Sequence, residues 1–349
     1  MTGTQRVDVA LLERLSNAFG PPGDEGQVRE ILRDALRERV DELRTDTMGN
    51  LFAVKHAAVS GAASRPQRIL LTAHMDEPAL MVVAVEGNGL LRVHAAGHIE
   101  PRALVGQVVL VNKGMRGVIS VTPFHLTSSE ARKTIPDMDS LGIDIGVDGR
   151  EAAEGAVKRG SYAVFDTLFE PMGELLKGKA LDNRAGVAVL AAVLAGDYPC
   201  DVHAVFTVQE GVGARGARIA AFAVEPDAAI VVDGHAVDEL PEEDGDEPPV
   251  RLGRGPVITL SENGVLAHQG LVARLAAAAK SGSIPTQMAA RGAHVGEARV
   301  VHVAGDGVPT ALVGLPVRYP HTAASLMHPA DLDAAVALLE QTLQLKVTR

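Results

Sequence analysis

The sequence predicts an α/β fold, a sheet with helices on both faces, interrupted by an inserted segment of a different kind. Strand-like and helical runs alternate from about residue 170 to the C-terminus, and both kinds of run also occur between residues 8 and 76. Such alternation is typical of a layered α/β sheet. Residues 77–169 are instead rich in Val, Gly and turn residues, which indicates short strands in a small barrel or sandwich.

The first part of the chain begins with two helical patterns within residues 8–43, separated by FGPPGDE. The Pro-Pro-Gly run at 21–23 ends the first helix, and we expect Asp24 to cap the second. RTDTMGNLFAVKH follows, with a Gly-Asn turn between strand-like runs. RILLTAHMD then predicts a strand that carries His74 at its C-terminal end.

Within the inserted segment, EGNG and NKGMRG are hairpin signals, and TSSEARKTIPDMDS is expected to be a loop with a short helix. The α/β pattern returns at ALDNRAGVAVL and ends with the helical run DLDAAVALLEQTLQL. We therefore assign residues 1–76 and 170–349 to one α/β domain and residues 77–169 to an inserted β-barrel domain. The acidic run at 238–249 is expected to be an exposed loop.

Composition excludes several classes of protein. A formal charge of −11 argues against a nucleic-acid surface, which needs clustered Lys and Arg. The single cysteine, Cys200, excludes an internal disulfide and a cysteine metal cluster. The longest apolar stretch, 185–196, is too short to span a bilayer, and the N-terminus reads as an amphipathic helix rather than a signal peptide. We expect a soluble, cytoplasmic globular enzyme.

Five short motifs follow apolar or strand-like runs: AHMDE, ALDNR, VQEGVG, VVDGH and RYPHT. Imidazole and carboxylate groups together are the ligands expected of a hydrolytic zinc, cobalt or manganese site. No G-x-S-x-G elbow, Walker A loop, strand-linked G-x-G-x-x-G or H-E-x-x-H motif offers a different chemistry. The residues that the five motifs supply are His74, Asp182, Glu210, Asp233 and His321.

Each motif also has a plainer interpretation when taken alone. His74 could be a surface histidine, although Asp76 lies two residues on and could accept the other imidazole N–H. Asp182 could cap a helix, and Asn183 and Arg184 could be surface polar residues. Glu210 could be a turn acid rather than a general base.

Histidines are numerous, and a lone histidine after a strand is more often structural than a ligand. His321 follows Pro320, whose fixed ring could aim the imidazole. All histidines outside the motifs are assigned by default to roles other than metal binding: His56, His94, His98, His125, His203, His268, His294, His302 and His328.

Almost the whole chain resembles the glutamyl and deblocking aminopeptidases of the tetrahedral metallopeptidase family, some of which carry the names cellulase or endoglucanase. The resemblance includes the five motifs in order and also LSNAFGPPGDE, HIEPRALVGQVV, GIDIGV, GKALDNRAGVAVL and RLGRGPVI. It implies a three-layer, zinc-peptidase-like catalytic domain with a mixed sheet and an inserted barrel domain for dimerisation. It also implies peptide substrates and homo-oligomers, from a dimer up to a hollow dodecamer.

The resemblance implies a role for each motif residue. Asp182 bridges two metals, His74 and Asp233 complete one metal site, and His321 belongs to the other. Glu210 matches the general base that activates a metal-bound water, and Asp76 matches the acid that orients the first histidine. The implied cofactor is a divalent metal, zinc or cobalt, with one or two ions per chain. The bond between Asp182 and Asn183 matches the position of a cis peptide.

The chain departs from the family where Q-E-E-V-G becomes Gln209–Gly213, with Gly211 in place of a ligand to the second metal. The family's Gly-Gly-Thr-Asp-Ala is also replaced by residues 292–296, and MDEIGL becomes MDEPAL. Three hypotheses follow. In the first, an aminopeptidase works with one tight metal and one weak or substrate-assisted metal. In the second, a substitute ligand enters, with His235, His294 and Glu297 as candidates. In the third, the chain is a non-catalytic homologue that acts as a binding or scaffold protein.

Overall fold

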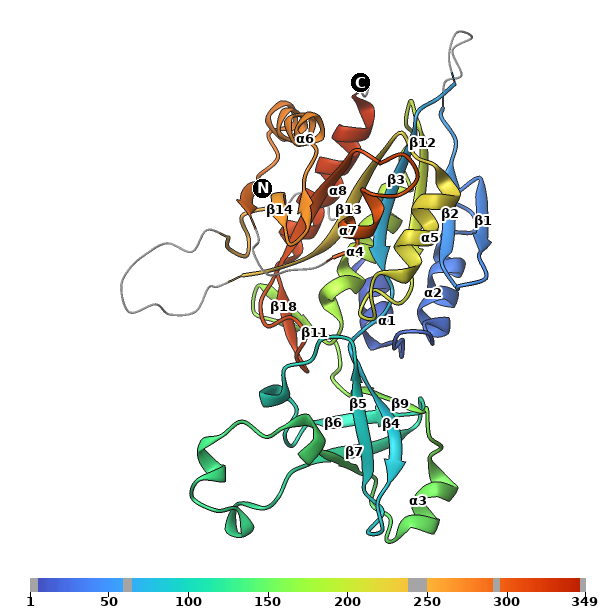
Figure 1. The fold of residues 1–349 in the computed structure, drawn as a ribbon. Coiled ribbons are helices and arrows are strands. Elements are labelled where there is room, and N and C mark those ends of the chain that lie inside the picture. The colour runs from blue at the N-terminus through green and yellow to red at the C-terminus, as the bar shows by residue number, and fades with distance from the viewer. Residues whose placement is uncertain (1–5, 59–64, 238–249, 291–295, 346–349) are drawn as a thin grey trace, which may run out of the picture.

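The fold is a large mixed sheet with helices on both faces, above a closed barrel (Figure 1). This computed structural model describes residues 6–58, 65–237, 250–290 and 296–345. The predicted α/β class with an inserted barrel is confirmed. The acidic run at 238–249 lies outside the described residues.

The large sheet has the strand order β1-β2-β12-β3-β13-β17-β14-β15, and β16 pairs with β14. β12, β3, β13 and β17 are parallel neighbours in its centre, whereas β2 pairs antiparallel with β1 and β12, and β14 pairs antiparallel with β17. The strands are β1 (Glu42–Thr45), β2 (Leu51–Lys55), β3 (Arg68–His74), β12 (Asp201–Thr207), β13 (Ala228–Ala236), β14 (Val257–Glu262), β15 (Val265–Leu266), β16 (Gln287–Ala290) and β17 (Thr310–Val317).

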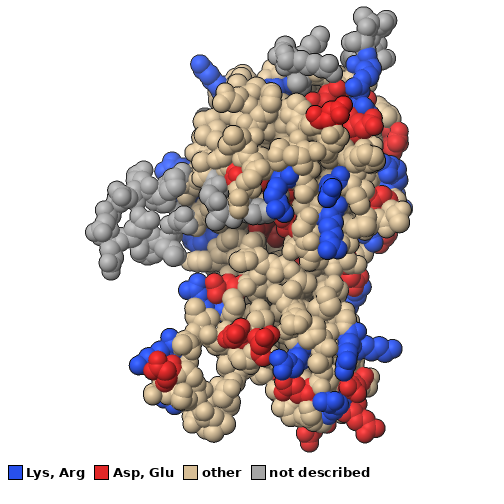
Figure 2. All heavy atoms as spheres, viewed as in Figure 1, with Lys and Arg blue, Asp and Glu red and all other residues tan. Residues whose placement is uncertain are grey.

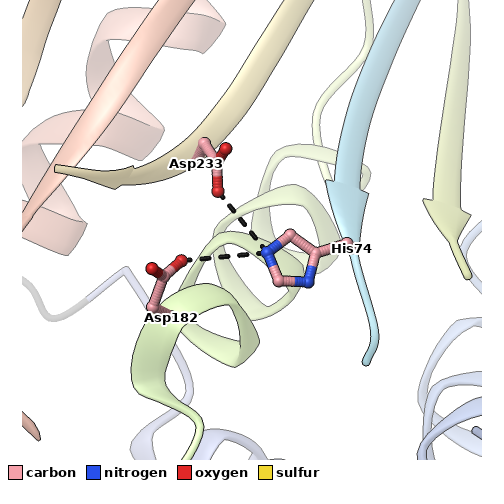
Figure 3. Close-up of side chains that lie close together, drawn as sticks. All are labelled: His74, Asp182 and Asp233. Atoms are coloured by element: carbon pink, nitrogen blue, oxygen red, sulfur yellow. Dashed lines mark ion pairs between the residues drawn. The ribbon is translucent and has the colours of Figure 1, made fainter. Parts of the chain in front are cut away.

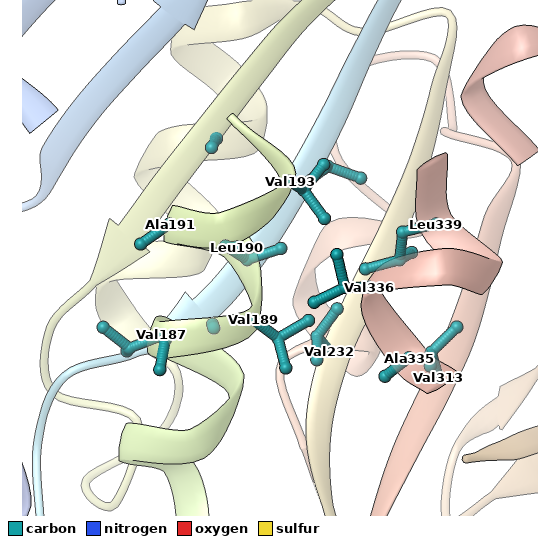
Figure 4. Close-up of a cluster of buried hydrophobic side chains, with 14 of the residues drawn as sticks. Val187, Val189, Leu190, Ala191, Val193, Val232, Val313, Ala335, Val336 and Leu339 are labelled. Carbon is teal, nitrogen blue, oxygen red and sulfur yellow. The ribbon is translucent and has the colours of Figure 1, made fainter. Parts of the chain in front are cut away.

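Helices cover both faces of this sheet because the central strands are apolar on both sides. Along β13, residues 228, 230 and 232 belong to the larger core, and residues 229 and 231 belong to a second core on the opposite face. The larger core includes α4 and α8 (Figure 4), together with α1, α2 and α6, and the second includes α5 and α7. The helices are α1 (Val9–Asn17), α2 (Gly26–Leu36), α4 (Leu181–Val193), α5 (Arg215–Val224), α6 (Gln269–Gly282), α7 (Ala298–Val301) and α8 (Pro329–Gln344).

The inserted segment closes into a barrel with the order β4-β5-β8-β7-β6-β9 and its own apolar core. The chain enters it directly after β3 and leaves it towards a small sheet of β10, β11 and β18. The barrel elements are β4 (Ala79–Val85), β5 (Leu91–Ala96), β6 (Val108–Val111), β7 (Met115–Ser120), β8 (Gly142–Asp144), α3 (Arg150–Ala156) and β9 (Tyr162–Phe165). The small sheet contains β10 (Glu170–Met172), β11 (Leu175–Gly178) and β18 (Ser325–Met327).

Two local predictions are wrong. The residue before α2 is Glu25 rather than Asp24, and its side chain does not cap the helix. Its carboxylate instead accepts hydrogen bonds from the backbone N–H groups of Gly23 and Gln209. Asn183 and Arg184 are fully buried rather than surface residues, because both bond to the backbone of the core.

Candidate active site

The carboxyl ends of the four parallel strands bring four of the five predicted residues to one edge of the large sheet. His74 is the last residue of β3, and Asp233 lies towards the end of β13. Glu210 follows β12, and His321 follows β17. Ligands of open α/β sheets bind at this edge, where the loops after parallel strands meet.

His74, Asp182 and Asp233 form a buried cluster (Figure 3). Nε2 of His74 lies 3.5 Å from Oδ1 of Asp233 and 3.8 Å from Oδ1 of Asp182. Among the described residues, this is the one trio of candidate ligands whose donor atoms all lie within 4.8 Å of one another. The second oxygen of Asp182, Oδ2, lies 3.5 Å from Nε2 of His321. Asp182 thus presents a different oxygen to each imidazole, as a bridging carboxylate would.

Asp182 reaches this position through an unusual start to α4. Its peptide bond to Asn183 is cis, and both residues have non-helical backbone angles. Asn183 bonds to the backbone of Gly186 through Oδ1 and to the carbonyl of Val232 through Nδ2. The helix-cap interpretation of Asp182 is therefore wrong, because Asn183 accepts the bond from the first turn.

Because Gly234 has no side chain, the Asp182 carboxylate can lie directly against the end of β13. A Cβ atom at Gly234 would lie 2.7 Å from Oδ2 of Asp182 and nearer still to its other carboxyl atoms. Real Cβ atoms do not approach other atoms this closely. The Gly234 N–H also donates to Oδ1 of Asp182 at 3.2 Å. A glycine is therefore required here by close approach.

The electrostatics of the cluster favour a bound cation. Burial alone would lower the pKa of His74, but the carboxylates of Asp233, Glu210 and Asp76 raise that pKa well above its usual value. Burial would raise the pKa of Asp182, yet interactions with the two imidazoles lower it. Two buried carboxylates share the cluster with one imidazole, so a divalent ion would compensate the excess negative charge. These oxygen and nitrogen donors suit zinc, cobalt or manganese.

The turn that carries Glu210 is held by two buried carboxylates. Three consecutive backbone N–H groups donate to them: Gln209 to Glu25 at 3.2 Å, Glu210 to Asp76 at 2.9 Å, and Gly211 to Asp76 at 3.0 Å. Gln209 has a positive φ of 58°, a strained conformation that the surrounding bonds must maintain. The position of Glu210 is therefore fixed by its backbone.

Glu210 is partly buried, and burial raises its pKa well above the usual value. Asp233 and Asp76 raise this pKa further, whereas His74 opposes the shift. A carboxylate whose pKa is moved towards neutrality is suited to exchange protons with a substrate or water.

Asp76 contacts His74 in a different way from the one predicted. Nδ1 of His74 lies 3.1 Å from the backbone oxygen of Asp76 and 3.7 Å from its carboxylate. The nearer partner of the imidazole is thus the main chain. The carboxylate holds the Glu210 turn, so Asp76 connects His74 to the candidate base.

Sequence reasoning missed a buried ionic cluster beside this site. Nζ of Lys179 lies 2.7 Å from both carboxylate oxygens of Glu77, and Nη2 of Arg184 lies 3.3 Å from one of them. Arg184 also donates to the carbonyl groups of Met75 and Leu15. This Glu77 cluster joins the turn after β3 to the end of α1. The sequence does show these polar residues within apolar runs. The residues that pair, however, are more than 100 positions apart in the chain.

The structure describes two of the three residues that the sequence offered as substitute ligands. The ring of His235 lies against Gly314 of β17, where an added Cβ would be 2.9 Å from Nδ1. Glu297 is buried and accepts a hydrogen bond from Thr207 at the end of β12. His294 lies outside the described residues. Gly211 is exposed and offers no side chain.

The face shown in Figure 2 is hollowed between the α/β domain and the barrel, and acidic side chains are recessed in the hollow. In the ranges that the structure describes, no helix is long and apolar enough to cross a membrane.

Fold and site together define a peptidase-like hydrolase of the α/β class, and the comparisons place it more narrowly. The sequence profile of the M42 glutamyl aminopeptidase family matches residues 49–338. The chain belongs to this family. It is an enzyme, a hydrolase of the aminopeptidase type.

Several known proteins are similar to this chain over almost its full length. The lysyl aminopeptidase of Pyrococcus furiosus is 31% identical over 348 residues, covering 97% of each chain. Aminopeptidase APDkam598 of Desulfurococcus kamchatkensis has a TM-score of 0.90 at 29% identity, covering 96% of this chain and 94% of that one. The TET1 peptidase of Pyrococcus horikoshii, whose structural report describes a tetrahedron or a large octahedral shell, has a TM-score of 0.84 at 30% identity, covering 96% and 99%.

Proposed function

We propose that this aminopeptidase is metal-dependent and removes N-terminal residues from peptides, with a divalent ion held by His74, Asp182 and Asp233. The observation that carries the proposal is the buried cluster of these three side chains, whose donor atoms lie within 4.8 Å of one another. Three protein ligands are the usual number at a catalytic zinc site. Zinc and cobalt both suit the donor set.

A bound ion would polarise the scissile carbonyl group and acidify water. Glu210 then takes a proton from the attacking water and returns it to the leaving amine. The carboxylates of Asp76 and Glu25 hold the Glu210 turn through three backbone N–H groups, which keeps the base at the edge of the metal cluster. Asp76 therefore positions the base in addition to contacting His74.

The oligomeric state is part of the same proposal. We assign residues 77–169 to an inserted domain through which two copies dimerise. Large apolar side chains are exposed on this segment, and Phe124 and Leu126 are 72% and 69% exposed. Exposed apolar surface of this kind is typical of protein interfaces. The assemblies of the TET1 relative make a homo-oligomer, from a dimer up to a dodecamer, the expected state.

Replacing the base tests the proposal. Glu210→Gln should lower turnover of an aminoacyl reporter by about 10²- to 10⁴-fold while bound metal stays unchanged. Glu174→Gln, on an exposed loop, is the matched control and should leave turnover intact. Unchanged turnover in Glu210→Gln would refute the base assignment. Absence of turnover in the unmodified protein with zinc, cobalt and manganese would favour the alternative of an impaired homologue with a binding or scaffold role.

A further inference from the structure

His98 lies beside the second half of the site, although it belongs to the barrel segment. Its ring centroid is 5.5 Å from that of His321, at an interplanar angle of 66°. His321 in turn points Nε2 at Oδ2 of Asp182, 3.5 Å away. His98 therefore lies next to the imidazole that faces Oδ2 of Asp182, the oxygen not directed at His74.

The missing side chain at Gly211 makes room for this arrangement. A Cβ at Gly211 would lie 3.0 Å from Cα of Gly97, a distance at which the neighbour must give way. Gly97 has a φ of 100°, and its own added Cβ would be 3.4 Å from Pro78. The backbone next to His98 therefore packs directly on Gly211. The glycine at position 211 supplies no carboxylate to the site. Its lack of a side chain also leaves space for the segment that carries the His98 imidazole.

The segments that carry His98 and His321 both pack in the barrel core. Ile99, next to His98, is buried in this core, and Ala323, two residues after His321, packs in the same cluster. His321 itself has a positive φ of 60°, a conformation that non-glycine residues adopt only when their surroundings enforce it. The two segments that carry these rings are thus packed in the same apolar core.

We propose that His98 is the third protein ligand of a second divalent ion, bound together with Asp182 and His321. This inference rests on the proposed metal-dependent function and supplies a ligand where Gly211 has none. Asp182 and His321 alone would leave an ion with two protein ligands, whereas a catalytic zinc usually has three and a water. The ion itself would share Asp182 with the first, which permits two-metal chemistry.

The separation of the rings agrees with joint coordination. With zinc–nitrogen bonds of about 2.1 Å, two imidazoles on one ion have ring centroids about 5 to 6 Å apart. The donor atoms of His98, Asp182 and His321 do not all lie within 4.8 Å of one another, so joint coordination requires the His98 side chain to change its rotamer. The side chain is exposed, and exposed side chains change rotamer on a timescale of about nanoseconds.

Cobalt titration of the full-length, metal-stripped protein tests this ligand. Bound cobalt is measured by equilibrium dialysis with elemental analysis, and the cobalt absorption spectrum reports the ligand field of each ion. We expect two ions per chain, and we expect His98→Ala to weaken the second by at least about tenfold, the loss caused even by removal of an outer-shell partner. The control is His94→Ala, another exposed histidine of the barrel, which should bind both ions normally.

Each outcome has a distinct meaning. Two ions bound equally well by His98→Ala, with an unchanged spectrum, would overturn the inference. A single ion per chain in the unmodified protein would also overturn it, but would leave the first site and the proposed function intact. Failure to bind any cobalt would contradict the proposed function itself.

Discussion

Removing the charge of Glu77 should destabilise the fold strongly, because two buried cations depend on it. The side chains of Glu77, Lys179 and Arg184 are 2%, 5% and 0% exposed. Breaking a buried ion pair by removing one partner costs about 3 to 5 kcal/mol. Glu77→Gln keeps the shape of the side chain but leaves both cations without their carboxylate. We therefore expect a loss of about 3 to 5 kcal/mol in the free energy of unfolding at pH 7.

The pH dependence separates charge from packing in this variant. Burial lowers the pKa of Lys179 to about 8, against the attraction of Glu77. Without Glu77 this pKa falls further, so the variant sheds the buried charge at a lower pH than the unmodified protein. The part of the stability deficit that comes from Lys179 should accordingly shrink as the pH rises towards about 8 and be absent above it, where this side chain is neutral in both proteins.

Urea denaturation at pH 7 and pH 9, followed by circular dichroism, measures both effects. The control is Lys177→Gln, which removes a more exposed pair whose side chains are 21% and 56% exposed. Such a pair contributes at most about 1 kcal/mol. A deficit in Glu77→Gln no larger than that of the control, or one that does not change with pH, would refute the assignment of a buried ionic cluster.

Two further predictions concern the site and its support. Gly234→Ala should weaken metal binding at least about tenfold because its Cβ displaces the Asp182 carboxylate; Gly155→Ala, whose Cβ meets nothing within 4 Å, is the control in a dialysis assay. Burial raises the pKa of Glu25 from 4.5 to about 7, so the native state holds a proton that the unfolded state loses in this window, and stability falls as pH rises through it. The melting temperature of Glu25→Gln, measured relative to that of the unmodified protein, should therefore increase between pH 4.5 and pH 7. A difference in melting temperature that stays constant with pH would contradict this prediction.

Local patterns in the sequence predicted the fold class and the placement of the site. Strand-like runs that end in an acid or a histidine were sufficient to place His74, Glu210 and Asp233 at one sheet edge, since parallel strands share their carboxyl ends. The alternation of strand-like and helical runs likewise predicted helices on both faces of the sheet.

Contacts between distant segments could not be predicted in this way. Glu77 and Lys179 are 102 positions apart, and no spacing rule connects them. The same holds for His98 and His321, which meet only because the barrel and the loop after β17 share a core. The need for a glycine at position 234 likewise depends on a distant residue, because it arises from the Asp182 carboxylate that lies beside it.

Anomalous X-ray diffraction from crystals of the cobalt-loaded protein would locate the ions directly. We expect one peak about 2 Å from Nε2 of His74 and within bonding distance of the Asp182 and Asp233 carboxylates. A second peak is expected beyond Asp182, beside His321 and His98. Cobalt bound elsewhere, with no peak inside the His74–Asp182–Asp233 cluster, would contradict the assignment of this cluster as the metal site of the aminopeptidase.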